Sequence, residues 1–259
     1  MFTGTILFAM TAAAVSCTVV VVRQGMRWGS GSEERATPMP GDDWFKGGPP
    51  ARLRMTRAIS IAEPPDRVWP WLAQLGRGAG WYSIDALDNG GKVSARRLVS
   101  WIPAPCVGDA AAIGYLRHLA PGREMAWWMP GVAFLGALAR MAFSIRLLPE
   151  STGSRLVIRI SGDAAGPTGW SALCLFAAID SIMACRQLVG IKERVERCGP
   201  AGSWPEAPEI GARDQYQLYE TIYASGERAG RRGRELAARW RQAAIKAGAI
   251  EDPSREDAR

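Results

Sequence analysis

The chain has one histidine, four lysines and no pair of cysteines at metal-binding spacing. A zinc site needs several His or Cys ligands close together, so we expect no metal and no cofactor. The same scarcity argues against Cys-His or Ser-His-Asp catalysis, because His118 alone would have to serve, and catalytic residues stay unassigned. Reduced thiols in a cytoplasmic domain account for the five cysteines, which include no C-x-x-C pair: Cys17, Cys106, Cys174, Cys185 and Cys198.

The formal net charge is +7, and nearly all of the basic residues are arginines. Arginine excess fits phosphate recognition or, with this much Ala and Gly, a GC-rich genome. The glycines from Gly76 to Gly80 follow a predicted helix, whereas nucleotide-binding glycines follow a strand. Trp69, Trp71 and Trp81 occupy core-like positions rather than a nucleic-acid surface. We therefore expect neither a nucleotide nor a nucleic acid as partner.

The first residues of the chain are apolar, and Phe2–Val22 contains no charged side chain. At about 1.5 Å per residue this span just crosses a hydrocarbon core of about 30 Å. We expect residues 1–22 to be a single-pass membrane anchor, with Arg23 and Arg27 placing the main domain in the cytoplasm. A cleaved signal peptide, with a cleavage site near Ala14, or a lipoprotein signal ending at Cys17 are the alternatives.

Residues 23–50 are predicted to be a linker, because Gly29–Pro50 is rich in Gly, Pro and charge and has no period. Two large aromatic residues, Trp44 and Phe45, are unusual in such a linker. They fit either a segment docked on the domain or an interfacial anchor near the bilayer.

The clearest local signals lie between Thr56 and Asn89. Arg57–Ile61 alternates as a half-buried strand, and Pro65 suits the first position of a helix. Pro70 should kink that helix, and Gly76, Gly78 and Gly80 end it. Trp81 and Tyr82 open the next element, predicted to be a second helix. The first helix has one apolar face, formed by Val68, Trp71, Leu72 and Leu75.

This segment, IAEPPDRVWPWLAQLG…GWYSIDALDN, resembles the opening of bacterial members of the START-like helix-grip superfamily (SRPBCC, which includes polyketide cyclase/dehydrase and lipid-transfer domains). Pro40-Gly41-Asp42-Asp43 resembles the PGDD that precedes the domain in membrane-anchored members. Val107-Gly108-Asp109 and the run MACRQLVGIKERVE from Met183 to Glu196 also match the family in order. The resemblance implies an α+β domain over residues 51–199, in which an antiparallel sheet wraps a long C-terminal helix and leaves an apolar cavity.

The middle of the chain is typical of antiparallel strands. Strands are predicted at Ala111–His118 and Arg123–Met129, with a mixed, extended piece at Ser94–Trp101. Met141–Leu148 and Arg155–Ser161 form the cleanest hairpin, with a turn at Ser151–Gly153. Gly131–Ala139 is apolar on all sides and is predicted to be a buried loop-helix or a cavity lip.

The spacing predicts a long helix over Ser171–Arg197, with one apolar stripe formed by Leu175, Ile179, Ile182, Met183 and Val189. Arg186 falls near the centre of this stripe. It either pairs with a carboxylate, for which we suggest Asp85, or supplies the polar group of a ligand cavity. Asp85 and Asp88 are three residues apart, which is too generic a pattern to assign them as an acid/base pair.

Residues 200–259 are predicted to be a Pro/Gly linker and a basic helical tail. The helix, over Asp214–Ala247, fits either contact with anionic lipid or a solvated charged face.

Three functions remain open. The resemblance implies binding of an apolar small molecule or lipid between sheet and helix, for which we prefer a membrane-tethered binding protein. The alternatives are a cyclase/dehydrase-like enzyme on a polyketide or aromatic substrate, and an interaction module whose cavity is filled by its own tryptophans. The nominated cavity residues are Trp81, Tyr82, His118, Trp127, Met183 and Arg186.

Overall fold

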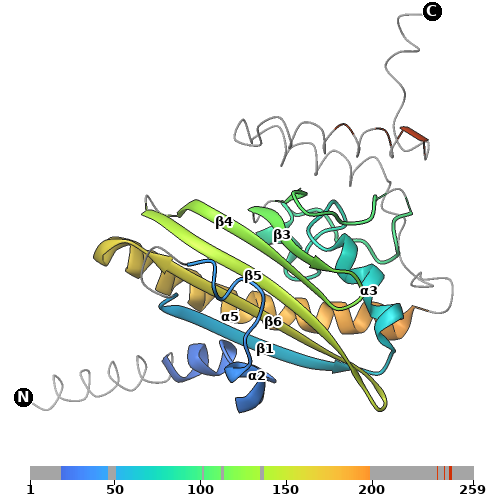
Figure 1. Cartoon of the computed structure of the whole chain (residues 1–259), viewed down its shortest axis with the longest axis horizontal. Helices are drawn as coiled ribbons and strands as arrows, with labels where there is room; N and C mark the ends of the chain where they lie inside the picture. Colours follow the sequence, from blue (N-terminus) through green and yellow to red (C-terminus); the bar gives the residue numbers. More distant parts are fainter. Residues whose placement is uncertain are drawn as a thin grey trace, which may run out of the picture.

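The computed structural model of the chain describes residues 19–45, 51–100, 102–111, 114–134 and 137–198, and the single positions 238, 242, 245 and 246. Most of the expected anchor (1–22) and of the C-terminal tail (200–259) therefore lies outside the described residues. The rest forms a six-stranded antiparallel sheet of order β1-β6-β5-β4-β3-β2 that curves along one long helix, α5 (Figure 1). This is the helix-grip architecture that the resemblance implied.

The strands are β1 (Leu53–Ile61), β2 (Ala110–Ala111), β3 (Gly114–Ala120), β4 (Glu124–Phe134), β5 (Ala137–Glu150) and β6 (Gly153–Ala164). The helices are α2 (Ser32–Ala36), α3 (Pro65–Gln74), α4 (Asp85–Asp88) and α5 (Gly166–Arg197), and residues 19–25 are also helical.

The β1–α3 unit has the predicted form. Pro65 is the first residue of α3, and Pro70 lies inside the helix. All four residues of the predicted apolar face are buried in the main core: Val68, Trp71, Leu72 and Leu75. The second predicted helix is reduced to the single turn of α4, because residues 81–84 form a bend in which Tyr82 has φ 60°.

The loop after α4 contains the predicted extended piece near Ser94, which forms no strand among the residues described there. Asp85 holds this loop, because its carboxylate accepts hydrogen bonds from the backbone N–H and the hydroxyl of Ser94. Farther along, Arg77 and Asp109 form a buried ion pair of 2.7 Å. Asp109 belongs to the family-like VGD run, so that run has a structural role here.

The β5–β6 hairpin is confirmed, with paired residues from Ala139↔Ala164 to Glu150↔Gly153. The loop-helix interpretation of Gly131–Ala139 is wrong, whereas the cavity-lip alternative agrees with Ala139, which lines the cavity described below. This segment continues β4 and begins β5, which pair down to Phe134↔Ala137. Periodicity cannot separate a strand with two apolar faces from a buried helix when the run is this short.

The long helix α5 is confirmed, but its predicted buried stripe is wrong. The residues packed against the sheet are small or lie on another face, and they include Ala172, Leu173, Ala177, Leu188 and Ile191. Leu175, Ile179 and Ile182 of the predicted stripe are exposed. Small residues allow α5 to approach its neighbours closely: a Cβ on Gly190 would lie 2.0 Å from the Tyr82 carbonyl oxygen.

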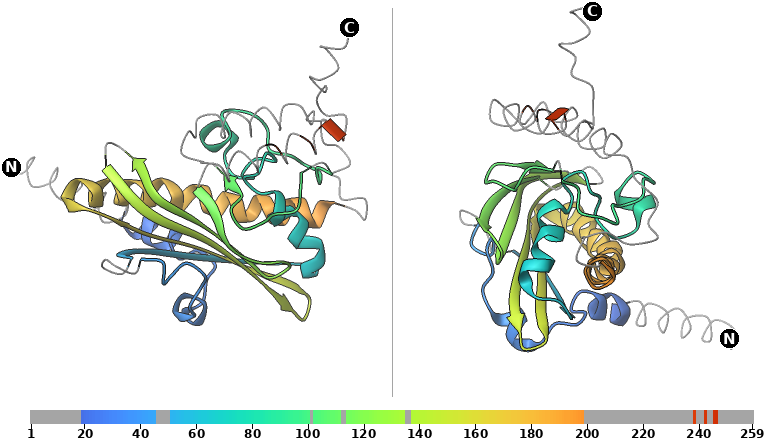
Figure 2. Two further views of the ribbon diagram at one scale, coloured as in Figure 1. Left: turned by 45° about the horizontal axis from the view of Figure 1, so that its top comes forward. Right: turned by 90° about the vertical axis from the view of Figure 1, so that its right-hand side faces the viewer.

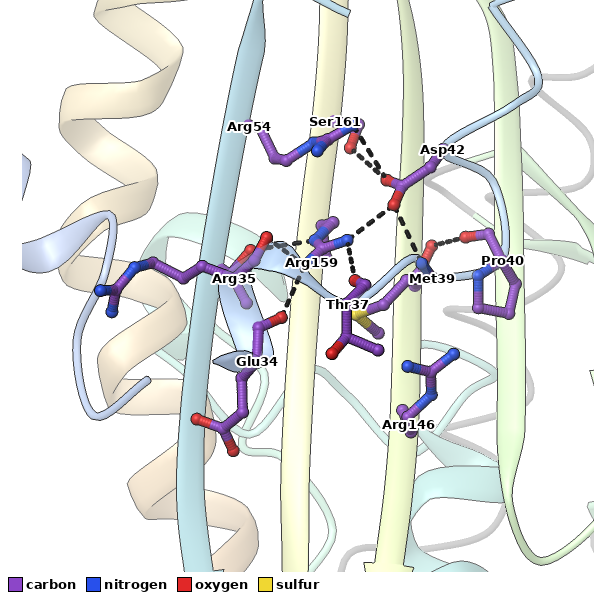
Figure 3. A network of polar contacts seen from close by, with 12 residues as sticks. Glu34, Arg35, Thr37, Met39, Pro40, Asp42, Arg54, Arg146, Arg159 and Ser161 are labelled. Carbon is purple, nitrogen blue, oxygen red and sulfur yellow. Dashed lines mark hydrogen bonds and ion pairs between the residues drawn. The ribbon is translucent and has the colours of Figure 1, made fainter. Parts of the chain in front are cut away.

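Residues 28–45, which we call the strap, belong to the predicted linker. They cover the outer face of the sheet. Phe45 packs there against Trp128, with ring centroids 5.2 Å apart. Figure 3 shows the polar centre of the contact, where Arg159 on β6 points into the strap. Its guanidinium bonds the Asp42 carboxylate at 2.6 Å and the carbonyl oxygens of Glu34 and Thr37 at 2.8 and 2.9 Å. Asp42 belongs to the PGDD run, so this motif fastens the strap.

Candidate functional site: an apolar cavity between sheet and α5

A cavity of about 420 Å³ lies between α5 and the inner face of the sheet. Its sheet wall is apolar and comes from β4, β5 and β6: Met129, Ala139, Met141, Phe143 and Ile160. Its helix wall comes from α5 between Gly169 and Gln187, where Gly169, Ala172 and Ala184 leave room. Apolar surface there is supplied by Leu173, Phe176, Ile179 and Met183. The small residues of α5 therefore help to create the space as well as the close packing.

Four polar side chains interrupt this apolar lining: Ser83, Asp88, Asp180 and Gln187. Two of them are held by backbone groups. The Gln187 side-chain amide donates to the Trp81 carbonyl at 3.0 Å, and the Ser83 hydroxyl donates to the Met183 carbonyl at 2.9 Å. These bonds tie α5 to the bend after α3, which lines the cavity through Trp81 and Ser83.

Asp180 belongs to a buried ion pair in the wall. Its Oδ2 lies 2.9 Å from an Arg57 terminal nitrogen, and the Arg57 side chain is fully buried beneath α5. Burial raises the pKa of Asp180, and the neighbouring guanidinium only partly offsets that effect. Arg57 also donates through Nε to the Gly25 carbonyl at 2.7 Å, so one guanidinium joins β1, α5 and the helical residues 19–25.

Asp88 is the second carboxyl group in the cavity wall, and no cation is among the groups that shift its pKa. Burial raises its pKa to about 6, Ser83 opposes that shift, and the nearby Asp85 charge adds to it. Its Oδ1 is buried and has no hydrogen-bond partner among the described residues. A carboxyl group in this state can accept a hydrogen bond from a ligand, or donate one when protonated.

The structure places two of the six nominated residues in the cavity wall, Trp81 and Met183. Tyr82 and Trp127 are buried in the core instead. Tyr82 accepts a hydrogen bond from the Gln74 amide at 2.7 Å and stacks under the Arg194 guanidinium, 4.4 Å from its ring centroid. Trp127 packs against Phe143, with ring centroids 5.5 Å apart.

The remaining two nominated residues lie away from the cavity. His118, on β3, is partly exposed beside Glu124, with its Nε2 3.4 Å from the carboxylate. Arg186 is partly exposed on α5 and pairs with Glu193 at 3.2 Å rather than with Asp85. Arg186 is therefore neither a buried charge nor a cavity group, because its side of the helix faces outward.

Asp88 and Asp180 are the chemically distinctive residues that the sequence did not place in the site. Asp180 sits four turns into an otherwise uncharged helical stretch, which was the only available signal for it. Within the described part of the chain, no three His, Cys, Asp or Glu side chains come together as metal ligands.

No protein-family model and no curated protein sequence matches the chain. Solved structures similar to it include a Mesorhizobium loti protein (16% identity, 57% of this chain and 99% of that one, TM-score 0.36). A second is an AHSA1-like protein from Rhizobium etli, with 18% identity over 62% of this chain and 91% of that one and a TM-score of 0.36. A third is the di-domain ARO/CYC protein StfQ of the steffimycin biosynthetic pathway, with 13% identity over 56% of this chain and 50% of that one and a TM-score of 0.36. At these scores the similarities carry no functional argument.

Proposed function

We propose that the chain is a membrane-tethered binding protein that holds an apolar small molecule or lipid in the cavity between the sheet and α5. The observation that supports this most directly is the cavity itself. Its volume of about 420 Å³ falls within the range of small-molecule sites, roughly 300–1,000 Å³. Its lining also has the usual composition of such sites, a mostly apolar wall with a few polar groups that orient the ligand.

The membrane tether rests on the sequence. Phe2–Val22 is uncharged and is followed by Arg23 and Arg27, which favour a cytoplasmic domain. Within the described residues one helix, α5, is long and apolar enough to cross a membrane, and it is the central helix of the fold. The anchor is therefore a proposal about the residues that precede the domain.

The proposal is tested by filling the cavity. Full-length protein extracted in mild detergent is analysed by native mass spectrometry for a co-purifying small molecule, and titrated with an apolar fluorescent probe. Ala184→Leu adds bulk to the cavity wall and should abolish both signals, while Ala86→Leu, on the exposed side of α4, should leave both unchanged. A wild-type protein that carries no molecule and binds no probe would contradict the proposal, provided that its thermal unfolding is cooperative.

A second function, a cyclase/dehydrase-like enzyme, is favoured by one observation. Asp88 faces the cavity with a pKa raised to about 6, close to the value at which a carboxyl group transfers protons efficiently near neutral pH. In that case Asp88→Asn should keep ligand binding and abolish turnover of a bound polyketide or aromatic substrate. Unchanged turnover in Asp88→Asn would exclude this role for Asp88.

A further inference from the structure

The outer face of α5 is unusually apolar in its first half. Leu175, Ile179 and Ile182 are 47%, 44% and 66% exposed, and their spacing of four and three residues puts them on one side of the helix. Residues 166–179 contain no charged side chain. The second half of the helix is different, because Arg186, Lys192, Glu193, Glu196 and Arg197 lie there. The exposed apolar surface is thus confined to one end of α5.

The helical residues 19–25 pack against the middle of α5, at residues 181–185, where the exposed apolar face ends. The Ser181 hydroxyl donates to the Ala177 carbonyl of its own helix at 2.6 Å and lies 3.3 Å from the Val22 carbonyl oxygen, and the Cys185 thiol donates to the Gly25 carbonyl at 3.7 Å. Figure 2 shows this segment beside α5, at the edge of the sheet that β1 forms. Val19, Val20 and Val21 are exposed there as well. Two exposed apolar surfaces therefore lie together.

The contact leaves the segment little freedom to move away from α5. The Arg57 side chain donates to the carbonyl oxygen of Gly25, the last residue of this helical segment. The chain then pairs with the edge of β1, where the Ala58 N–H donates to the Trp28 carbonyl at 3.0 Å. The Ser30 hydroxyl reaches the Thr56 carbonyl at 2.8 Å, and the strap is fixed beyond it by Arg159. The predicted linker is thus bonded to the domain from residue 25 onward, and no free segment separates residue 22 from the domain.

From this geometry we infer that the exposed face of α5, formed by Leu175, Ile179 and Ile182, lies in the interfacial layer of the lipid bilayer. A bilayer that receives the uncharged Phe2–Val22 must approach the domain where that segment joins it, which is beside this face. Burying the face removes apolar side chains from water, a favourable step of the kind that holds amphipathic helices at membranes. The exposed Arg23 and Arg27 can meet anionic headgroups at the same level.

The inference deepens the proposed function and rests on it: its first part uses the membrane tether, and its second part uses the ligand cavity. Ile179 belongs both to the exposed face and to the cavity wall, and its neighbours Phe176 and Met183 also line the cavity. The cavity therefore borders the surface that faces the bilayer. An apolar ligand can pass between the two along α5 without crossing bulk water.

The position of the face is tested on the full chain in vesicles of phosphatidylcholine and phosphatidylglycerol that contain a diazirine-labelled phospholipid. After irradiation, peptide mass spectrometry locates the lipid adducts. We expect adducts over residues 170–183. As an internal control we expect few at Leu148, which is 38% exposed but lies at the β5–β6 hairpin. The double variant Leu175→Glu/Ile182→Glu changes no residue of the cavity wall and should lower the adducts on α5 about tenfold, equivalent to 1.4 kcal/mol. The matched Leu148→Glu should lower none.

Absence of adducts over residues 170–183, with adducts present before residue 23, would overturn the inference. It would mean that the chain's own first residues or a second copy covers the face. This readout needs no ligand, so it is independent of the ligand-binding part of the proposed function and shares only its membrane tether. Loading is measured separately, as the uptake of a pyrene-labelled fatty acid. The double variant should take it up more slowly from vesicles and equally well from detergent micelles. No uptake by the wild type from either source would refute the proposed function and leave the docking result standing.

Discussion

Arg57 offers the most direct test of how the cavity wall and the N-terminal segment are held together. Its side chain is fully buried, 2.9 Å from the Asp180 carboxylate and 2.7 Å from the Gly25 carbonyl. An arginine stays charged at any physiological pH. Asp180→Asn therefore leaves a buried guanidinium without its counter-charge.

The expected cost is about 3 kcal/mol of unfolding free energy, the lower part of the range for breaking a buried pair, because the Gly25 carbonyl still accepts one hydrogen bond. For a chain of this length the corresponding fall in Tm is about 6–12 °C. Burial outweighs the attraction of Arg57 in setting the pKa of Asp180, so the intact pair adds little net stability. Arg57→Met/Asp180→Leu should consequently recover most of the loss.

The measurement is denaturant unfolding of the full chain in detergent, followed by tryptophan fluorescence. It is made for the wild type, for Asp180→Asn, for the two single variants Arg57→Met and Asp180→Leu, and for the double variant that combines these two. A matched pair is Arg155 on β6 and Glu34 on the strap, also 2.7 Å apart but partly exposed, which should contribute less than about 1 kcal/mol. If Asp180→Asn costs no more than Glu34→Gln, and the two single effects add within about 0.5 kcal/mol, the buried pair does not exist as described.

Three further predictions concern other parts of the fold. Trp71→Ala should cost about 3–5 kcal/mol by opening a cavity in the core, and a Tm within error of wild type would show that this face of α3 is exposed. Gly190→Ala should cost about 1–3 kcal/mol, measured by the same unfolding, because the new Cβ would meet the Tyr82 backbone at 2.0 Å; an unchanged stability would mean that α5 lies farther from the loop. For Asp88 the folded pKa of about 6 lies above the ordinary aspartate value of 3.8, so the folded state binds more protons and stability falls as pH rises through that window. Asp88→Asn removes this loss. As pH rises from 4 to 7, the unfolding free energy of Asp88→Asn should therefore increase by about 1 kcal/mol relative to that of the wild type, a figure that allows for solvent screening of a half-buried group. The control Asp66→Asn, at an exposed position, should show no such increase.

Local signals explain what could be predicted from the sequence. Pro65 at the start of α3 and the four apolar residues of that helix act within a few turns, so the pattern alone identifies the element and its buried face. The β5–β6 hairpin is equally local, because its two strands alternate on either side of a short turn. Elements of this kind are decided by neighbours in the chain.

The strap and the cavity depend instead on residues far apart in the sequence. Asp42 meets Arg159 across 117 positions, and no periodicity connects them. Asp88 and Asp180 reach the same cavity from a one-turn helix and from α5. Of the nominated residues, Trp81 and Met183 reach it because they lie on the bend and on the inward side of α5, whereas Arg186 is three residues beyond Met183 and points outward. Three residues on an α-helix are only about 60° apart around its axis, and on α5 that small rotation separates a cavity residue from a surface residue.

The error over the stripe of α5 has a physical cause that bears on the proposed membrane contact. Periodicity identifies a buried face by contrast with a polar one, and in residues 166–179 no such contrast exists, because both faces lack charge. A core helix of a protein surrounded by water would gain solubility from charged residues on its outer side, as the second half of α5 has. The first half has Leu175 and Ile179 there instead, beside Val19, Val20 and Val21. A helix that packs on a sheet with one face and on lipid with the other needs two apolar faces, and it needs them only along the part that reaches the bilayer.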